Sequence, residues 1–180
     1  MKPTEEWTYE ISKLNIPIIG LDISKYSIEL AKEYFKNDSL HFIDKAINKA
    51  KFDEPFDLIV ANMSLMDTDN IFENFTEICK NLKDGGKMLI TIIHPCFWPI
   101  YWDYTNDSGF DYLKEQKITK TYKTTNTTFF GFKTTHFHRP INFYLNLFSQ
   151  NNMKLNEMQE LRNPIDKMWY PRFLFFELTK

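Results

Sequence analysis

The chain has 180 residues and a nearly balanced charge, with 22 basic and 24 acidic side chains and a formal net charge of −2. This balance argues against nucleic acid as the main partner, because phosphate backbones are bound by an excess of Lys and Arg. No apolar run is long enough to span a bilayer, and two cysteines cannot build a disulfide framework. We therefore expect a cytoplasmic protein with no membrane partner.

Two features of the composition are unusual. Only five glycines occur where average usage of about 7% predicts roughly twelve, and none precedes Gly20. A glycine-rich nucleotide loop at the front of the chain is thereby excluded. Aromatic residues reach 17%, and fifteen of the thirty lie between Cys96 and Phe148.

Strands and helices are predicted to alternate over the first half of the chain. Short apolar runs predict buried strands at residues 17–22, 40–44, 56–64 and 87–93. Apolar residues at helical spacing predict helices at residues 4–15, 25–35 and 69–82, the last of them ended by the KDGG segment, residues 83–86. This alternation predicts an α/β fold with a mostly parallel sheet.

The alternation stops after residue 93. Residues 94–138 show no clear helix and many Thr and aromatic residues, so we interpret them as a lid or insertion. A helix from Pro140 to about Gln150 and strands at residues 153–161 and 173–179 are predicted to complete the chain. No feature marks a second domain, and we expect a single domain over residues 1–180.

Four polar residues close the four predicted parallel strands, namely Asp22, Asp44, Asn62 and His94. Ligands of open parallel sheets bind at the carboxyl ends of strands, so these side chains are expected to converge. Asp22 is placed to accept hydrogen bonds from a ribose diol, or else to cap the following helix. Asp44 suits the amine of adenine and the capping role about equally.

The segments IIGLDISKYSIELAKEYF, FDLIVANMSLMD, LKDGGKMLITIIHPCF and HFHRPINFYLNLFSQNNMKLNEMQEL resemble, in this order, the class I S-adenosylmethionine-dependent methyltransferases of the small-molecule branch. The resemblance covers the chain from about residue 7 onward. It implies a Rossmann-like fold whose sheet ends in an antiparallel edge formed by the last two strands. It also implies S-adenosylmethionine as cofactor and methyl transfer to a small-molecule acceptor.

The resemblance assigns the cofactor to residues that follow three of the strands. Asp22 would bind the ribose hydroxyls and Ile23 would pack on the adenine ring. Asp44 and Lys45 would lie near the adenine amine. The methionine part and the sulfonium would be bordered by Asn62 and Met63.

On the acceptor side, the resemblance implies that three residues face the substrate pocket. His94 and His138 are the candidate general bases by the pKa range of imidazole, should the acceptor need deprotonation. Arg139 is expected to contact the substrate. The aromatic residues between 96 and 148 would cover the acceptor, although a hydrophobic lid packed on the sheet, or a dimer contact, explains most of them at least as well.

One departure from the family limits these expectations. The family's first strand and its acidic glycine-rich loop, E/D-x-G-x-G, have no counterpart in residues 1–19. We expect a gap between the strands at 17–22 and 56–64, weakened cofactor binding, and exposed strand edges through which two copies could pair. Four interpretations follow. The chain is a methyltransferase impaired by N-terminal truncation, or an inactive remnant or non-catalytic binding or scaffold protein. Alternatively, the protein starts upstream of Met1, or its sheet closes differently, through a partner chain or with fewer strands.

Other readings of the sequence are weaker. His94-x-Cys96 and His136-x-His138 supply metal-ligand side chains, but their spacing matches no known zinc signature, and we expect no metal site. A dinucleotide-dependent oxidoreductase needs the same absent loop. An enzyme that methylates a flipped nucleic-acid base is disfavoured because ANMSLMD lacks the proline–aromatic sequence of that class.

Overall fold

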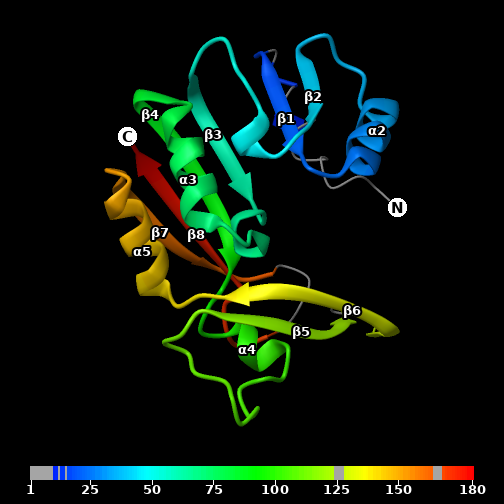
Figure 1. Ribbon diagram of the computed structural model, residues 1–180, viewed down its shortest axis with the longest axis vertical. Coiled ribbons are helices and arrows are strands. Elements are labelled where there is room, and N and C mark those ends of the chain that lie inside the picture. The colour runs from blue at the N-terminus through cyan, green and yellow to red at the C-terminus, as the bar shows by residue number, and fades with distance from the viewer. Residues whose placement is uncertain (1–9, 12, 15, 124–127, 164–167) are drawn as a thin grey trace. The chain divides into compact units, whose positions relative to one another are not determined.

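The computed structural model describes residues 10–11, 13–14, 16–123, 128–163 and 168–180. The chain forms two compact units, residues 1–53 and residues 54–180 (Figure 1). The helix predicted over residues 4–15 lies mostly outside the described residues, and the expectation of one domain stays a prediction. No helix in the described part of the chain has the length and apolar character needed to cross a membrane.

The first unit is a parallel pair of strands joined by one helix. β1 (Ile18–Asp22) pairs with β2 (Leu40–Asp44), α2 (Lys25–Tyr34) connects them, and a short 3-10 helix, η1 (Ile47–Lys49), follows β2. Ser24 caps α2, because its Oγ accepts the N–H of Ser27 at 3.2 Å. The apolar side chains of the helix and strands form one small core of Ile28, Ala31, Leu40 and Phe42. The predicted strands and helix of this region are confirmed.

The second unit is built on a four-stranded sheet in the order β3-β4-β8-β7. β3 (Phe56–Asn62) runs parallel to β4 (Leu82–Ile93), whereas β8 (Phe173–Thr179) pairs antiparallel with both β4 and β7 (Lys154–Leu161). The antiparallel edge pair expected at the end of the chain is thus confirmed.

Two helices cover one face of this sheet. α3 (Ile71–Lys80) and α5 (Ile141–Gln150) both contribute to its core, as Figure 1 shows from their position over the strands. The ring of Phe148 lies 5.5 Å from that of Phe75 on α3 and 5.1 Å from that of Phe176 on β8, measured between centroids. These aromatic contacts join the two helices to the centre of the sheet.

The KDGG segment does not end a helix as predicted. α3 already ends at Lys80, and residues 83–86 belong to the first part of β4. Gly85 has φ +76°, and a Cβ on Gly86 would lie 2.8 Å from the carbonyl oxygen of Lys83. The two glycines therefore serve an irregular stretch of strand, where the pairing with β3 shifts register, because only glycine fits this backbone.

Residues 94–138, the predicted lid, have more regular structure than their sequence predicts. A short helix, α4 (Trp98–Tyr101), is followed by the antiparallel hairpin of β5 (Gln116–Lys123) and β6 (Thr128–His138). An aromatic cluster of Tyr101, Trp102, Tyr104 and Tyr170 forms a separate small core in this region.

β3 is one edge of the four-stranded sheet, and β1 is half of a two-stranded sheet. Within the described residues β1 pairs only with β2, and β3 pairs only with β4. Leu58 and Val60 of β3 remain 42% and 44% exposed although their sequence is that of a buried strand. Apolar side chains of β3 are thus exposed beside a strand edge that no described strand pairs with.

Candidate functional site

Two carboxylates end the strands of the first unit. Asp22 and Asp44 are register partners in a parallel pair, so both lie at the carboxyl end of the β1–β2 sheet. One oxygen of Asp22, Oδ1, accepts the N–H of Ser24 at 2.7 Å, which helps to start α2. The cap position of η1 is Ala46, so Asp44 does not take the capping role that was its alternative.

The residues that follow these carboxylates are exposed. Ile23, directly after β1, is 78% exposed, and Lys45, directly after β2, is also exposed. The carboxyl end of this sheet therefore presents two acidic groups, one cation and one aliphatic side chain to solvent. All four residues predicted for the nucleoside part of a cofactor lie at this one edge.

In the second unit, the residues predicted to bind the cofactor lie in the turn after β3. Asn62 ends the strand and is exposed, and Met63 adopts φ +53°. A left-handed conformation is uncommon for a residue other than glycine, and it stores strain that the surrounding structure must hold. The N–H of Met63 donates to the carbonyl of Thr91 at 2.8 Å, which ties this turn to β4.

His94 follows β4 and is 1% exposed. Its Nδ1 accepts the N–H of Cys96 at 3.2 Å, so the proton of the neutral ring sits on Nε2, which lies 2.9 Å from Oε1 of Glu160. Both ring nitrogens are thus engaged by the protein. As a result, His94 is held in one tautomer between the lid segment and β7.

His138 ends β6 and is 3% exposed. Its Nε2 lies 2.9 Å from the carbonyl oxygen of Tyr112, and because a carbonyl only accepts, Nε2 carries the proton. Among the described residues, Nδ1 has no hydrogen-bond partner. Burial lowers the pKa of His138, with the Tyr112 carbonyl and the Asp111 carboxylate opposing the shift.

His136 lies two residues earlier, and its sequence context suggests only a metal ligand. It is 5% exposed, its Nε2 lies 3.2 Å from the hydroxyl of Tyr104, and its ring stands edge-on to that of Trp102 at 4.9 Å. Burial lowers its pKa to about 4, and the neighbouring His138 adds to this shift. Burial also raises the pKa of Tyr104, so this pair is neutral at pH 7.

Arg139 is enclosed by protein, with a side chain 0% exposed. Its Nε donates to Glu115 at 2.6 Å, its Nη2 to the carbonyl of Thr68 at 2.7 Å, and its Nη1 to that of Met66 at 3.4 Å. The guanidinium also lies 4.7 Å from the ring centroid of Phe137. The substrate contact expected of Arg139 stays a prediction, and its present contacts are all with the protein.

The structure brings some predicted residues together. Asn62 pairs with Thr91, three residues before His94, so both polar residues lie at the carboxyl end of the β3–β4 pair. Asp22 and Asp44 lie together in the other unit. The convergence of all four side chains on one crevice remains a prediction.

Several partners of these residues were not predicted from the sequence. Glu115, Glu160, Tyr104 and Tyr112 each contact a predicted His or Arg. Glu160 is an acid on an exposed edge strand, and no motif or spacing distinguishes it from a solvated charge.

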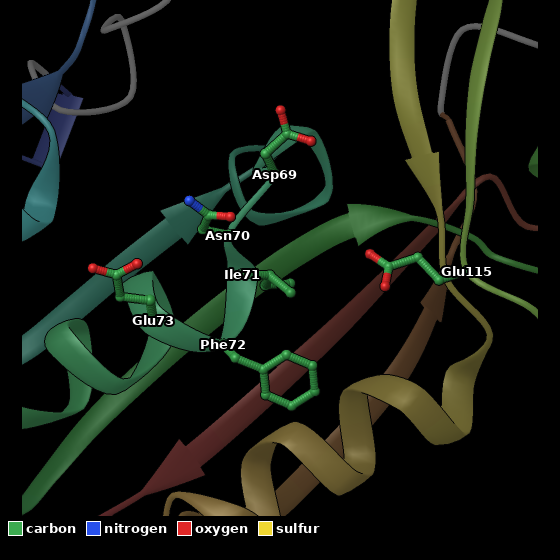
Figure 2. A pocket seen from close by; sticks show the side chains of 6 residues that line it. All are labelled: Asp69, Asn70, Ile71, Phe72, Glu73 and Glu115. Carbon is green, nitrogen blue, oxygen red and sulfur yellow. The ribbon is translucent and has the colours of Figure 1, made fainter.

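A depression of about 280 Å³ lies beside the start of α3. Five of its six lining residues come from that start and the turn before it, and the sixth, Glu115, comes from the segment before β5 (Figure 2). Its lining is acidic, and one of its carboxylates, Asp69, lies 3.7 Å from Lys117. Apart from Glu115, this depression shares no residue with the predicted site or its partners.

The metal-ligand side chains of the lid are dispersed. His94 contacts Glu160, Cys96 contacts Tyr112 through Sγ at 3.3 Å, and His136 and His138 contact Tyr104 and the Tyr112 carbonyl. No group of three or more His, Cys, Asp or Glu side chains able to hold a metal ion occurs among the residues that the structure describes.

Comparison with known families and proteins identifies the fold. The model of a family described as "Methyltransferase domain" matches residues 6–164. No protein of curated function matches the chain.

Solved structures of low sequence identity share the architecture. A putative S-adenosylmethionine-dependent methyltransferase from Listeria monocytogenes is 20% identical, with a TM-score of 0.75 over 97% of this chain and 85% of that one. The N-methyltransferase NodS from Bradyrhizobium japonicum is 11% identical, with a TM-score of 0.64 over 99% and 82%. A glycopeptide N-methyltransferase in complex with S-adenosylmethionine is 11% identical, with a TM-score of 0.65 over 96% and 75%. The predicted Rossmann-like α/β fold is confirmed.

Proposed function

Because the chain belongs to the methyltransferase-domain family, we propose that it transfers a methyl group from S-adenosylmethionine to a small-molecule acceptor. The observation that carries the proposal is the acidic edge of the β1–β2 sheet, where Asp22 and Asp44 stand in register beside the exposed Ile23. Carboxylates at strand ends accept hydrogen bonds from ribose hydroxyls and from the adenine amine, and an aliphatic side chain covers the base. These residues fit the nucleoside half of the cofactor.

The methionine half is assigned to the turn after β3. The exposed amide of Asn62 offers a donor and an acceptor, which suits an amino-acid moiety. Met63 presents a polarizable thioether next to it, in a strained conformation of the kind found at ligand sites. Lys45, which follows β2, adds a cation next to Asp44, one of the two acids proposed to bind the nucleoside.

When bound, S-adenosylmethionine supplies an activated methyl group that is displaced in line by the acceptor atom, so the protein must mainly align the two and exclude water. His138 is the better placed of the two candidate bases, because its Nδ1 keeps a lone pair that can take a proton from the acceptor. His94, held at both nitrogens, supports the wall of the acceptor site. The lid aromatics exclude water.

Calorimetric titration with S-adenosylhomocysteine tests the proposal. The chain should bind with a dissociation constant in the micromolar range, and Asp22→Asn should weaken binding by about 10- to 100-fold, the value of charge-assisted hydrogen bonds. Asp38→Asn is the matched control, since Asp38 is an exposed acid at the opposite end of β2. Equal affinities of the two variants would contradict the ribose assignment.

A non-catalytic binding protein with the same fold is the second candidate. It is favoured by the contacts of His94 and Arg139, whose side-chain nitrogens are bonded to protein groups at the predicted acceptor side. Absence of binding in the titration would favour this candidate.

The outer edge of β3, which no described strand pairs with, also supports pairing of two copies of the chain, because apolar side chains stand beside it. Sedimentation equilibrium should show a dimer that Val60→Lys dissociates. A concentration-independent monomer would contradict this pairing.

A further inference from the structure

The contacts of Arg139 join three parts of the second unit that are far apart in the sequence. Its guanidinium reaches the lid through Glu115, 24 residues away, and the turn after β3 through Met66 and Thr68, 73 and 71 residues away. The side chain is therefore a bridge between the lid and that turn.

The bridged turn has a constrained geometry. It begins at Met63, with φ +53°, and continues into a short 3-10 helix, η2 (Leu65–Asp67), whose Leu65 and Met66 side chains are buried in the core. The carbonyls that Arg139 holds, of Met66 and Thr68, lie at the end of this helix. The turn is thus fixed at one end by the N–H of Met63 on β4 and at the other by Arg139.

A lysine could not replace this bridge. Arginine carries five N–H donors in a rigid planar fork, whereas lysine offers a single compact ammonium. Arg139 uses three nitrogens on three different acceptors, and its flat face lies over Phe137 and Phe143 at 4.7 and 5.4 Å. Glu115 compensates the buried positive charge.

We propose that Arg139 is a positioning residue that couples the lid to the Asn62–Met63 turn, so that the cofactor-binding shape of this turn depends on the lid segment that carries Glu115. The role of the turn in cofactor binding rests on the proposed function. The mechanical coupling does not, because it concerns contacts within the chain alone.

Methyl NMR of the protein labelled with 13C at its methionine methyl groups tests the coupling without any ligand. Arg139→Lys should shift the resonances of Met63 and Met66, while those of Met88 and Met153, which are buried in the sheet core, stay in place. Glu115→Gln should move the same two resonances in the same direction by a smaller amount. Arg162→Lys is the matched control, because this exposed arginine also donates to a backbone carbonyl, that of Trp169.

Three outcomes overturn the proposal. If only Met66 shifts, the effect of Arg139 ends at the carbonyl it touches and does not reach Met63. If Met88 and Met153 shift as well, Arg139 stabilises the whole unit and has no positioning role. If Arg139→Lys does not fold, Glu115→Gln decides, and an unmoved Met63 resonance there rejects the coupling.

The cofactor arm of the test is separate. Titration with S-adenosylhomocysteine should show about tenfold weaker binding for both Arg139→Lys and Glu115→Gln than for Arg162→Lys, in the range of coupling between sites. If the unmodified chain does not bind, the proposed function fails while the NMR result still decides the coupling. If the unmodified chain binds and the bridge variants bind equally well, the functional part of the coupling is rejected.

Discussion

The buried His136 makes the stability of the second unit depend on pH. Its pKa is lowered to about 4 in the folded protein, mainly by burial, against about 6.5 in an unfolded chain. A histidine whose folded pKa is depressed binds fewer protons when folded, so its contribution to stability is complete above pH 6.5 and is lost as the pH falls toward 4. We therefore expect acid to unfold this unit through the lid.

The size of the effect follows from the two pKa values. Linkage gives a loss of about 2 kcal/mol in the free energy of unfolding by pH 5 and about 3 kcal/mol by pH 4 from this residue. The side chain is 5% exposed, so little of this is screened by solvent. The pKa of His138 is also lowered by burial, so this residue adds a loss of the same sign as the pH falls below about 6.5.

Urea unfolding followed by tryptophan fluorescence at several pH values measures this loss, because Trp98 and Trp102 lie beside the imidazole. His136→Gln keeps an acceptor for the hydroxyl of Tyr104 but cannot be protonated, so its stability should fall less steeply below pH 6.5. His41→Gln removes an exposed histidine of the other unit and is the control. Identical pH profiles for His136→Gln and the unmodified chain would refute the reasoning.

Two further substitutions test the packing of the second unit. Phe75→Ala should lower the free energy of unfolding in urea by about 3–5 kcal/mol, because this ring is 0% exposed and joins α3 to Phe148. Phe72 is 46% exposed, so Phe72→Ala should cost clearly less. Equal losses for the two variants would contradict the assigned core. Gly86→Ala should lower the free energy of unfolding by about 1–3 kcal/mol, because its Cβ would press on the carbonyl of Lys83 at 2.8 Å. A Cβ on Gly109 meets nothing within 4 Å, so Gly109→Ala should be neutral within about 0.5 kcal/mol. A neutral Gly86→Ala would show that the strand relaxes.

The strands and most helices could be predicted because their apolar periodicity is local. Runs such as residues 56–62 and residues 173–179 contain consecutive apolar residues, and Ser24 marks the start of α2 by a short-range hydrogen bond. The hairpin of β5 and β6 carries no such signal. Its Thr and Lys residues suit a loop as well as a strand, and pairs such as Thr119 and Thr135, bonded at 2.7 Å, form only between partners.

The glycines at 85 and 86 show a different limit. Glycine after a helical pattern usually marks the end of the helix, and this was the basis of the prediction. Here the helix is ended earlier by Asn81, whose side chain donates to the carbonyl of Glu77 at 2.9 Å, and the glycines serve the strand that follows. Residue type indicated a break in regular structure but not which element was broken.

The candidate site divides in the same way between local and distant contacts. Asp22 and Asp44 could be placed from the sequence, because a residue that ends a parallel strand has its position set by that strand. Arg139 could not, because two of its three acceptors are backbone carbonyls, which every residue carries and which leave no trace in side-chain chemistry. A cation beside two histidines suggests a substrate contact by type alone. Its position directly after β6 brings two of its donors to a turn about 70 residues away, and no local pattern in the sequence encodes that contact.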